Sequence, residues 1–277
     1  LERRSTLGAA PKHFFLVDGS GFIFRAYHAL PPLTRPDGTP VGAVYGFIQM
    51  LMKLIEDTDA DHIAIVFDTA RATLRNDIYP EYKANRSETP EDLIPQFSLI
   101  REATAAFGLA SVELQGFEAD DLIATYARAA ARDGAEVTIV SSDKDLMQLV
   151  DANITMFDAM RNRRIGPKEV KEKFGVAPDR VVEVQALAGD SSDNVPGVPG
   201  IGIKTAAELI LKYGDVENLL AHADEIKQPV RRERLKANAE MARLSHRLVQ
   251  LRDDVAVPAP IASFKVRAPD PAKLLEF

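Results

Sequence analysis

The chain has 277 residues, 46% of them hydrophobic, and a formal net charge of −7, a balance that fits one large core with a smaller appended module and excludes a disordered chain. It contains no cysteine, which excludes disulfides and thiolate metal sites, and its histidines are few, so any metal would be bound among oxygen atoms. No run approaches the roughly 18 apolar residues of a membrane span, and residues 1–12 lack the apolar stretch of a signal peptide, which predicts a cytoplasmic protein without membrane contact.

Strand-length apolar runs alternate with helical patterns over the first 160 residues. Four runs end in, or just before, an acidic residue, over residues 13–18, 62–68, 111–114 and 136–143. Between them, apolar residues recur at helical spacing over residues 42–57, 90–107 and 119–132. This alternation predicts an α/β fold with a mostly parallel central sheet flanked by helices. In such sheets the functional crevice lies at the carboxyl ends of the strands.

The strand pattern disappears from about residue 160. Short helical patterns follow over residues 167–174, 178–189 and 205–214. We therefore expect a catalytic domain over residues 13–166 and a smaller helical subdomain over residues 167–260.

Nine carboxylates fall at the ends of the expected elements rather than on solvated faces. They are Asp18, Asp68, Glu118, Asp120, Asp121, Asp143, Asp145, Asp190 and Asp193. Each alone is explained by a helix cap or a turn, but together in one crevice they would raise each other's pKa unless a cation neutralised them. Oxygen ligands select Mg²⁺ or Mn²⁺, and paired divalent ions suit the hydrolysis of phosphodiesters.

The Asp-Lys-Asp of residues 143–145 follows a strand and so also resembles the Asp-x-Asp of aspartate-nucleophile phosphatases. Those enzymes place a Gly-Thr turn after the second aspartate, whereas Leu146 and Met147 enter a helical pattern here. The negative charge is concentrated in these nine carboxylates rather than spread over the chain, so the net charge does not exclude a polyanionic partner.

Residues 197–210, GVPGIGIKTAAELI, have the pattern of a helix–hairpin–helix. Gly200 and Gly202 would let the backbone approach a phosphate at a helix N-terminus, and Lys204 would add charge. Such hairpins bind duplex backbone without reading its sequence.

Two further stretches carry candidate DNA contacts. Residues 71–86 combine Arg75, Lys83 and Arg86 with tyrosines that include Tyr82, a mixture suited to single strands, although the pattern alone fits a solvated helix equally well. Arg25, near the first strand, is another candidate phosphate contact.

Six segments closely resemble the 5′-nuclease domain of bacterial DNA polymerase I, a member of the flap endonuclease family. They read VDGSGFIFRAYHALPPL, VFDTA, YPEYKANR, GFEADDLIATYA, VSSDKDLMQLV and GDSSDNVPGVPGIGIKTAAELI, and the likeness covers nearly all of residues 13–277. The resemblance implies a PIN-like catalytic domain with a helical arch over about residues 70–92. It further implies a helix–three-turn–helix DNA-binding subdomain with its hairpin at 195–213, and a linker at 261–277 toward a missing downstream domain.

The same resemblance implies two metal sites. Asp68, Glu118, Asp120 and Asp143 would surround the first ion, and Asp145, Asp190 and Asp193 the second, more weakly held one. Asp18 and Asp121 would act mainly through bridging waters.

The resemblance also implies roles for basic and aromatic residues. Lys83 and Arg86 would lie over the scissile phosphate and act in catalysis with Asp68 and Asp143, and Tyr82 would stack on a base. Backbone carbonyls near Val198 and Ile201 would hold a monovalent cation such as K⁺. Ser87 and Glu88 follow Arg86 where a proline-rich run is expected, which departs from the family pattern.

The implied activity is that of a Mg²⁺-dependent 5′-3′ exonuclease and 5′-flap endonuclease with two ions. Its partners would be DNA with a 5′ flap, nick or 5′ end, RNA primer–DNA hybrids, and the proofreading and polymerase domains of the same polypeptide. It would act as a monomer in the cytoplasm, at the nucleoid. The alternatives are a free-standing nuclease and a metal-free module whose hairpin only binds duplex DNA.

Overall fold

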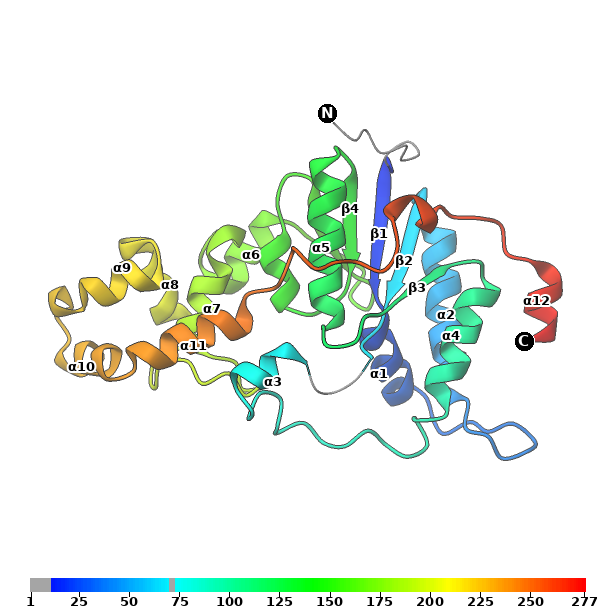
Figure 1. Cartoon of the computed structure of the whole chain (residues 1–277), viewed down its shortest axis with the longest axis horizontal. Coiled ribbons are helices and arrows are strands. Elements are labelled where there is room, and N and C mark those ends of the chain that lie inside the picture. The colour runs from blue at the N-terminus through cyan, green and yellow to red at the C-terminus, as the bar shows by residue number, and fades with distance from the viewer. Residues whose placement is uncertain (1–10, 70–72) are drawn as a thin grey trace.

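The computed structural model of the protein describes residues 11–69 and 73–277, and a six-stranded sheet lies at its centre (Figure 1). The strand order is β3-β2-β1-β4-β5-β6, with β1 to β5 parallel and β6 antiparallel to β5. The strands are β1 (His13–Asp18), β2 (His62–Val66), β3 (Ala110–Val112), β4 (Glu136–Val140), β5 (Ile154–Asp158) and β6 (Arg163–Ile165).

Helices cover both faces of this sheet, because its central strands are apolar on both sides. Alternate residues of β1 point to opposite faces: Phe14 and Leu16 pack in one core cluster, Phe15 and Val17 in another. The first cluster includes α5 (Ala119–Arg132), and the second includes α1 (Gly19–Ala29), α2 (Gly42–Asp57) and α4 (Gln96–Ala106).

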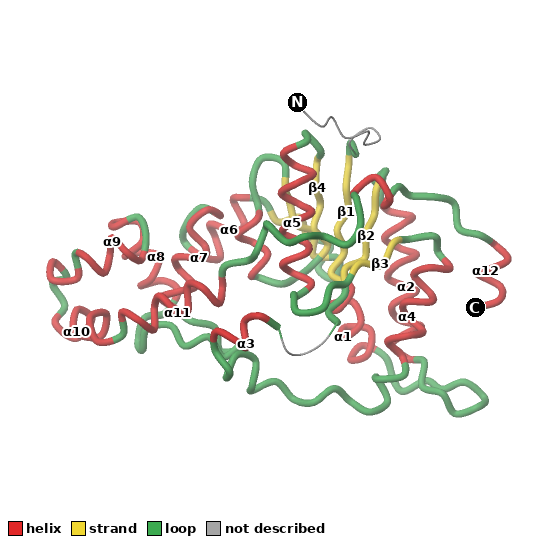
Figure 2. The backbone as a smooth tube through the Cα atoms, in the orientation of Figure 1, coloured by secondary structure: helices red, strands yellow, loops and turns green. Residues whose placement is uncertain are grey.

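Short helices after β6 form a subdomain that extends to one side of the sheet (Figure 2). They are α6 (Pro167–Phe174), α7 (Val181–Ala188), α8 (Ile203–Tyr213), α9 (Val216–Ala221), α10 (Pro229–Ala237) and α11 (Ala239–Val249). Most of their buried apolar side chains, such as Phe174, Leu187 and Leu235, belong to the same core cluster as α5, whereas Leu248 and Val249 of α11 belong to a separate small cluster. The core of the subdomain is therefore continuous with the core on the α5 side of the sheet.

The described part of the segment expected to be a helical arch, from residue 73 on, contains one short helix, α3 (Leu74–Ile78), followed by turns up to α4. From α3, which lies beside α11, this segment passes below the carboxyl ends of the strands to reach α4 (Figure 1). It is held there by the 190–194 loop, since the Lys83 amide donates to the Asp193 carbonyl at 2.9 Å and the Asn194 side chain donates to the Glu81 carbonyl at 2.7 Å. The first residues of the expected arch, 70–72, lie outside the described residues.

The α/β fold with a mostly parallel sheet and a helical C-terminal subdomain is the one predicted. The four predicted strand runs did not include β5 and β6, which form a hairpin on the sheet edge, and β6 is only three residues long. Such a short, arginine-rich strand has no apolar alternation to reveal it.

Residues 261–277 fold back onto the catalytic sheet. Phe264 is buried, its ring packs against those of Phe14 and Tyr126, and Lys265 forms a β-bridge to His62. The last helix, α12 (Pro271–Glu276), lies beside α4. Among the described residues, no helix combines the length and apolar character needed to cross a bilayer.

Candidate active site

Three aspartates follow parallel strands and therefore meet at one edge of the sheet. Asp18 ends β1, Asp68 lies two residues beyond β2, and Asp143 lies three residues beyond β4. Asp18 also caps α1, since its Oδ1 accepts the Gly21 amide at 2.7 Å and its Oδ2 accepts the Ser141 hydroxyl at 2.8 Å. The strand-to-helix turns thus fix these carboxylates at the carboxyl ends of the strands.

A pocket of about 350 Å³ opens at this edge. Five of the nine predicted metal ligands line it: Asp18, Asp143, Asp145, Asp190 and Asp193. Its remaining lining residues are Gly21, Arg86, Ser142, Lys144, Lys173 and Ser192.

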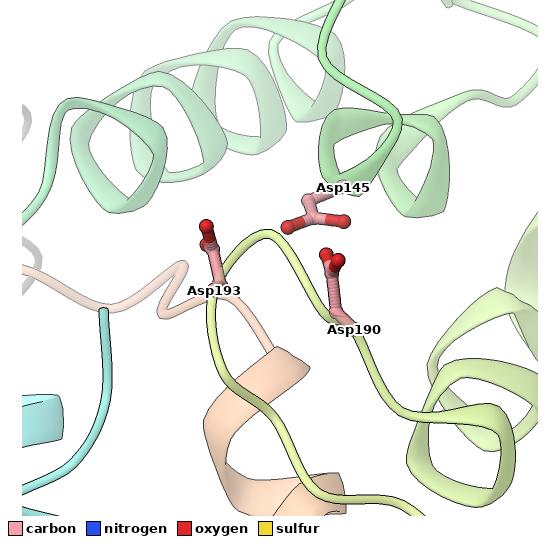
Figure 3. Close-up of side chains that lie close together, drawn as sticks. All are labelled: Asp145, Asp190 and Asp193. Atoms are coloured by element: carbon pink, nitrogen blue, oxygen red, sulfur yellow. The ribbon is translucent and has the colours of Figure 1, made fainter. Parts of the chain in front are cut away.

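Three aspartates in the pocket form a compact triad, Asp145, Asp190 and Asp193 (Figure 3). Each offers one carboxylate oxygen within 4.8 Å of the others, the only such group of three among the described residues. Asp145 begins the 3₁₀ turn after β4, whereas Asp190 and Asp193 lie on the loop after α7. Burial, together with the charge of Asp143, raises the pKa of Asp145 to about 7.

A second group of carboxylates lies on the α5 side of the pocket and is less compact. Burial raises the pKa of Asp120 well above its usual value, and the charges of Asp143, Asp18 and Asp68 add to the effect. Burial likewise raises the pKa of Asp18 to about 6, against the hydrogen bonds from Gly21 and Ser141. Asp68 accepts the Ala119 amide at 2.8 Å, which joins the end of β2 to the start of α5.

Cations of the chain itself neutralise part of this negative charge. Lys83 Nζ lies 2.9 Å from Glu118 and 3.6 Å from Asp193, and Arg86 also pairs with Asp193. Although burial raises the pKa of Asp193, these two cations outweigh it and hold that pKa below its usual value. Lys83 has φ of 57°, a left-handed conformation that is rare outside glycine and costs about 1–3 kcal/mol. The strain is consistent with a functional role for this lysine.

In this structure Arg75, which the sequence analysis expects to contact DNA, is engaged inside the protein instead. Arg75 is buried, and its guanidinium forms two hydrogen bonds with Asp121, at 2.7 and 2.8 Å. It also donates to the carbonyls of Leu248 and Gln250. The Asp121 carboxylate accepts the Arg252 amide as well, does not line the pocket, and is therefore placed to support the site rather than to coordinate an ion directly.

Tyr82 likewise does not offer its ring to a base in this conformation. The ring is buried, and its hydroxyl lies 3.3 Å from Glu118 and 3.2 Å from Asp193. Burial and these two carboxylates raise the pKa of Tyr82, so the hydroxyl stays protonated and donates to them. Tyr82 thus connects the arch segment by hydrogen bonds to Glu118 at the start of α5 and to Asp193 of the aspartate triad.

The predicted hairpin occupies the turn between α7 and α8. Gly200 has φ of +79°, and an exposed arginine, Arg234 of α10, lies directly against it. Gly202 precedes α8 with no atom within 4 Å of the position a side chain would take, and Lys204 is exposed one residue into the helix. This end of the hairpin is open to a phosphate, as the motif predicts.

Inside the hairpin, the side chains of Val198 and Ile201 are buried, and the Val198 carbonyl accepts the Ile201 amide at 3.0 Å. The Gly197 amide donates to the buried Ser245 hydroxyl of α11 at 2.9 Å. At the other side of the active-site edge, the Arg25 guanidinium donates to Ser142 at 3.3 Å, beside the pocket.

Sequence reasoning missed three side chains at the pocket. Lys144 lies between two predicted ligands, and its Nζ is 2.6 Å from Asp190. Lys173 reaches the pocket from α6, and Gln185 of α7 donates to Asp145 at 2.6 Å. Lys144 could have been predicted to lie at the site, because it stands between Asp143 and Asp145 in the sequence. Lys173 and Gln185 could not, because only the packing of the helical subdomain brings them there.

Comparisons with known proteins agree with this arrangement. Residues 13–175 match the family "5′-3′ exonuclease, N-terminal resolvase-like domain", and residues 176–272 match "5′-3′ exonuclease, C-terminal SAM fold". The chain is 57% identical over 273 residues to DNA polymerase I of Rhizobium leguminosarum, covering 96% of this chain and 27% of that protein. It is 39% identical over 263 residues to a 5′-3′ exonuclease of Aquifex aeolicus, covering 95% of this chain and 90% of that protein.

The chain thus spans about a quarter of the length of the DNA polymerase I relative. The fold is also that of the bacteriophage T5 flap endonuclease solved with DNA and metal ions, at a TM-score of 0.71 and 22% identity, covering 86% of this chain and 88% of that one. On the two family matches and the identity to these relatives, the chain belongs to the 5′-3′ exonuclease family.

Proposed function

We propose that the chain is a Mg²⁺-dependent, structure-specific 5′ nuclease that uses two divalent ions to hydrolyse phosphodiester bonds of DNA and of RNA primers paired with DNA. The observation that carries the proposal is the aspartate triad, whose oxygens lie within 4.8 Å of one another in a pocket bordered by the arch segment. The T5 flap endonuclease of the same fold, solved with DNA and metal ions, supports this substrate class.

The donor set fits hard divalent cations. All the converging ligands are carboxylate oxygens, the type that Mg²⁺ and Mn²⁺ prefer, and the raised pKa values of Asp18 and Asp145 reflect buried negative charge that lacks enough compensation. When bound, paired divalent ions acidify a water molecule and neutralise charge on the transferred phosphate. Asp68, Glu118, Asp120 and Asp143 would hold one ion, with Asp18 acting through a bridging water, and Asp145, Asp190 and Asp193 would hold the other.

The chain's own cations would bind the substrate. Lys83 and Arg86 already reach the carboxylates of the pocket, so the same side chains can donate to the non-bridging oxygens of a phosphate placed there. The open amide end at Gly202 and the exposed Lys204 would hold the duplex backbone, which positions DNA without reading its sequence. A K⁺ ion near the carbonyls of Val198 and Ile201 would strengthen that contact.

The cleavage assay that tests the proposal uses a labelled 5′-flap duplex. We expect cutting with Mg²⁺, 5′-phosphate ends on the downstream product, and no cutting after EDTA is added. Intact DNA in both reactions, with binding retained, would leave only the duplex-binding module.

The similarity to DNA polymerase I supports a place at the N-terminal end of such an enzyme, working with proofreading and polymerase domains in replication and repair at the nucleoid. One observation favours a free-standing nuclease instead, since the Aquifex aeolicus 5′-3′ exonuclease is covered over 90% of its length. An immunoblot of the native cell separates the two: a band much larger than 30.4 kDa supports the polymerase, and a band of that size supports the free-standing enzyme.

A further inference from the structure

Gln185 is a buried amide beside the aspartate triad. It lies on α7 and exposes 2% of its surface, and its Nε2 donates a hydrogen bond to Asp145 Oδ1 at 2.6 Å. At the other end of the amide, Oε1 is buried and has no hydrogen-bond partner among the described residues. An unpaired buried polar atom costs about 1–3 kcal/mol. An apolar side chain would avoid that cost, which indicates that the amide acts on Asp145.

The other two members of the triad are held by cations. Lys144 Nζ lies 2.6 Å from Asp190, and Lys83 and Arg86 pair with Asp193. A divalent ion entering the triad would be repelled by these side chains until they move. In the described part of the chain, the hydrogen bond to the Asp145 carboxylate comes from the neutral amide of Gln185, which repels no incoming cation.

The orientation of this amide is fixed by chemistry. For the ionised Asp145 carboxylate, the form that binds a cation, Nε2 toward Asp145 places a donor against an oxygen, whereas the reversed amide would place two oxygens face to face at the same short distance. Figure 3 shows the Asp145 carboxylate directed toward Asp190 and Asp193. The hydrogen bond therefore holds this carboxylate in the rotation that completes the triad.

We propose that Gln185 is a positioning residue that orients Asp145 for binding a divalent cation together with Asp190 and Asp193. The proposal deepens the proposed function and rests on it, because it concerns the second of the two metal sites. Groups that orient metal ligands through hydrogen bonds typically change metal affinity 10- to 100-fold when they are removed.

The test measures Mn²⁺ binding to the whole chain without DNA, by the electron paramagnetic resonance signal of free Mn²⁺. Gln185→Met keeps the volume of the side chain and removes the donor, and we expect it to weaken the weaker Mn²⁺ site at least about 10-fold while the tighter site is unchanged. Gln185→Lys places a cation against Asp145 and should abolish the weaker site while the metal-free protein keeps its melting temperature.

Gln148→Met is the matched control. Gln148 lies in the turn that carries Asp145, but its amide donates to the backbone carbonyls of Asp145 and Val249 rather than to the carboxylate. We expect this variant to lower the melting temperature and to keep both Mn²⁺ sites. Wild-type affinity at both sites in Gln185→Met and Gln185→Lys, or equal weakening in Gln148→Met, would overturn the proposal. If the wild-type protein binds no Mn²⁺ at all, the proposed function itself fails, and this proposal with it.

Discussion

The buried pair of Arg75 and Asp121 offers a direct test of what anchors the arch segment. Arg75→Met removes the guanidinium and leaves the Asp121 carboxylate, 2% exposed, without its partner. Breaking a buried pair from one side costs about 3–5 kcal/mol, because the remaining charge is uncompensated. The carbonyls of Leu248 and Gln250 also lose a donor. We therefore expect a loss of about 4 kcal/mol in the free energy of unfolding.

The measurement is urea unfolding followed by circular dichroism, with linear extrapolation to water. Arg243→Met is the matched control, since Arg243 makes the same two-bond contact with Glu217, at 2.7 and 2.8 Å, on the surface. The side chains of that pair are 37% and 65% exposed, so its loss should cost far less than the loss of the buried pair. The double variant Arg75→Met/Asp121→Leu should regain much of the stability, because no unpaired charge remains.

A different outcome would refute this reasoning. In that outcome, Arg75→Met loses no more free energy of unfolding than Arg243→Met does and instead binds flap DNA more weakly. The guanidinium would then contact the substrate rather than stabilise Asp121. The interpretation of this arginine as a DNA contact, which its sequence context allows, would then be supported.

Three further predictions concern catalysis and metal binding. Lys83→Ala should slow single-turnover cleavage more than it weakens flap binding measured by fluorescence anisotropy, because Lys83 pairs with Asp193, which lines the pocket; a defect confined to binding would contradict this. Asp143→Ala should abolish cleavage and retain DNA binding, since it removes a carboxylate and no cation, and an equal loss of both would count against that role. Burial raises the pKa values of Asp18 and Asp145 to about 6 and about 7. The folded, metal-free protein therefore keeps protons that the unfolded chain has lost, and the contribution of these two groups to stability falls as pH rises from about 4 to about 7. Mn²⁺ must displace the same protons, so its affinity should rise over pH 5 to 7.5 with proton release, measurable by calorimetry in two buffers; an affinity independent of pH would disprove the link.

The position of the main acids could be predicted because it follows from a rule about sheets. Asp18, Asp68 and Asp143 each come just after an apolar run, and the carboxyl ends of parallel strands share one edge. No comparable rule covers Asp190 and Asp193, which lie on a loop after α7. Their arrival at the same pocket depends on how α7 packs against the turn Asp145–Leu149, and here the resemblance to known nucleases supplied what the pattern could not.

The arch segment shows where sequence reasoning stops. Its apolar period is poor because it consists of one five-residue helix and a series of turns, so no pattern gives the direction of its side chains. Arg75 and Lys83 are both basic residues of this segment, and composition cannot distinguish them. The structure separates them by depth: Arg75 lies behind Glu118 against Asp121, whereas Lys83 reaches the side of Glu118 that it shares with Asp193.

That difference in depth follows from the energetics of buried charge. Asp121 is enclosed by protein, so only a cation that is buried with it can compensate its charge, and Arg75 has the planar geometry to do so with two hydrogen bonds. Asp193 borders an open pocket, where a mobile ion or a flexible lysine can serve equally well. The sequence gives the identity of these two cations but not their surroundings. Only the packing shows that Arg75 is buried with Asp121 and that Lys83 lies beside the open pocket, where we propose that it contacts the substrate.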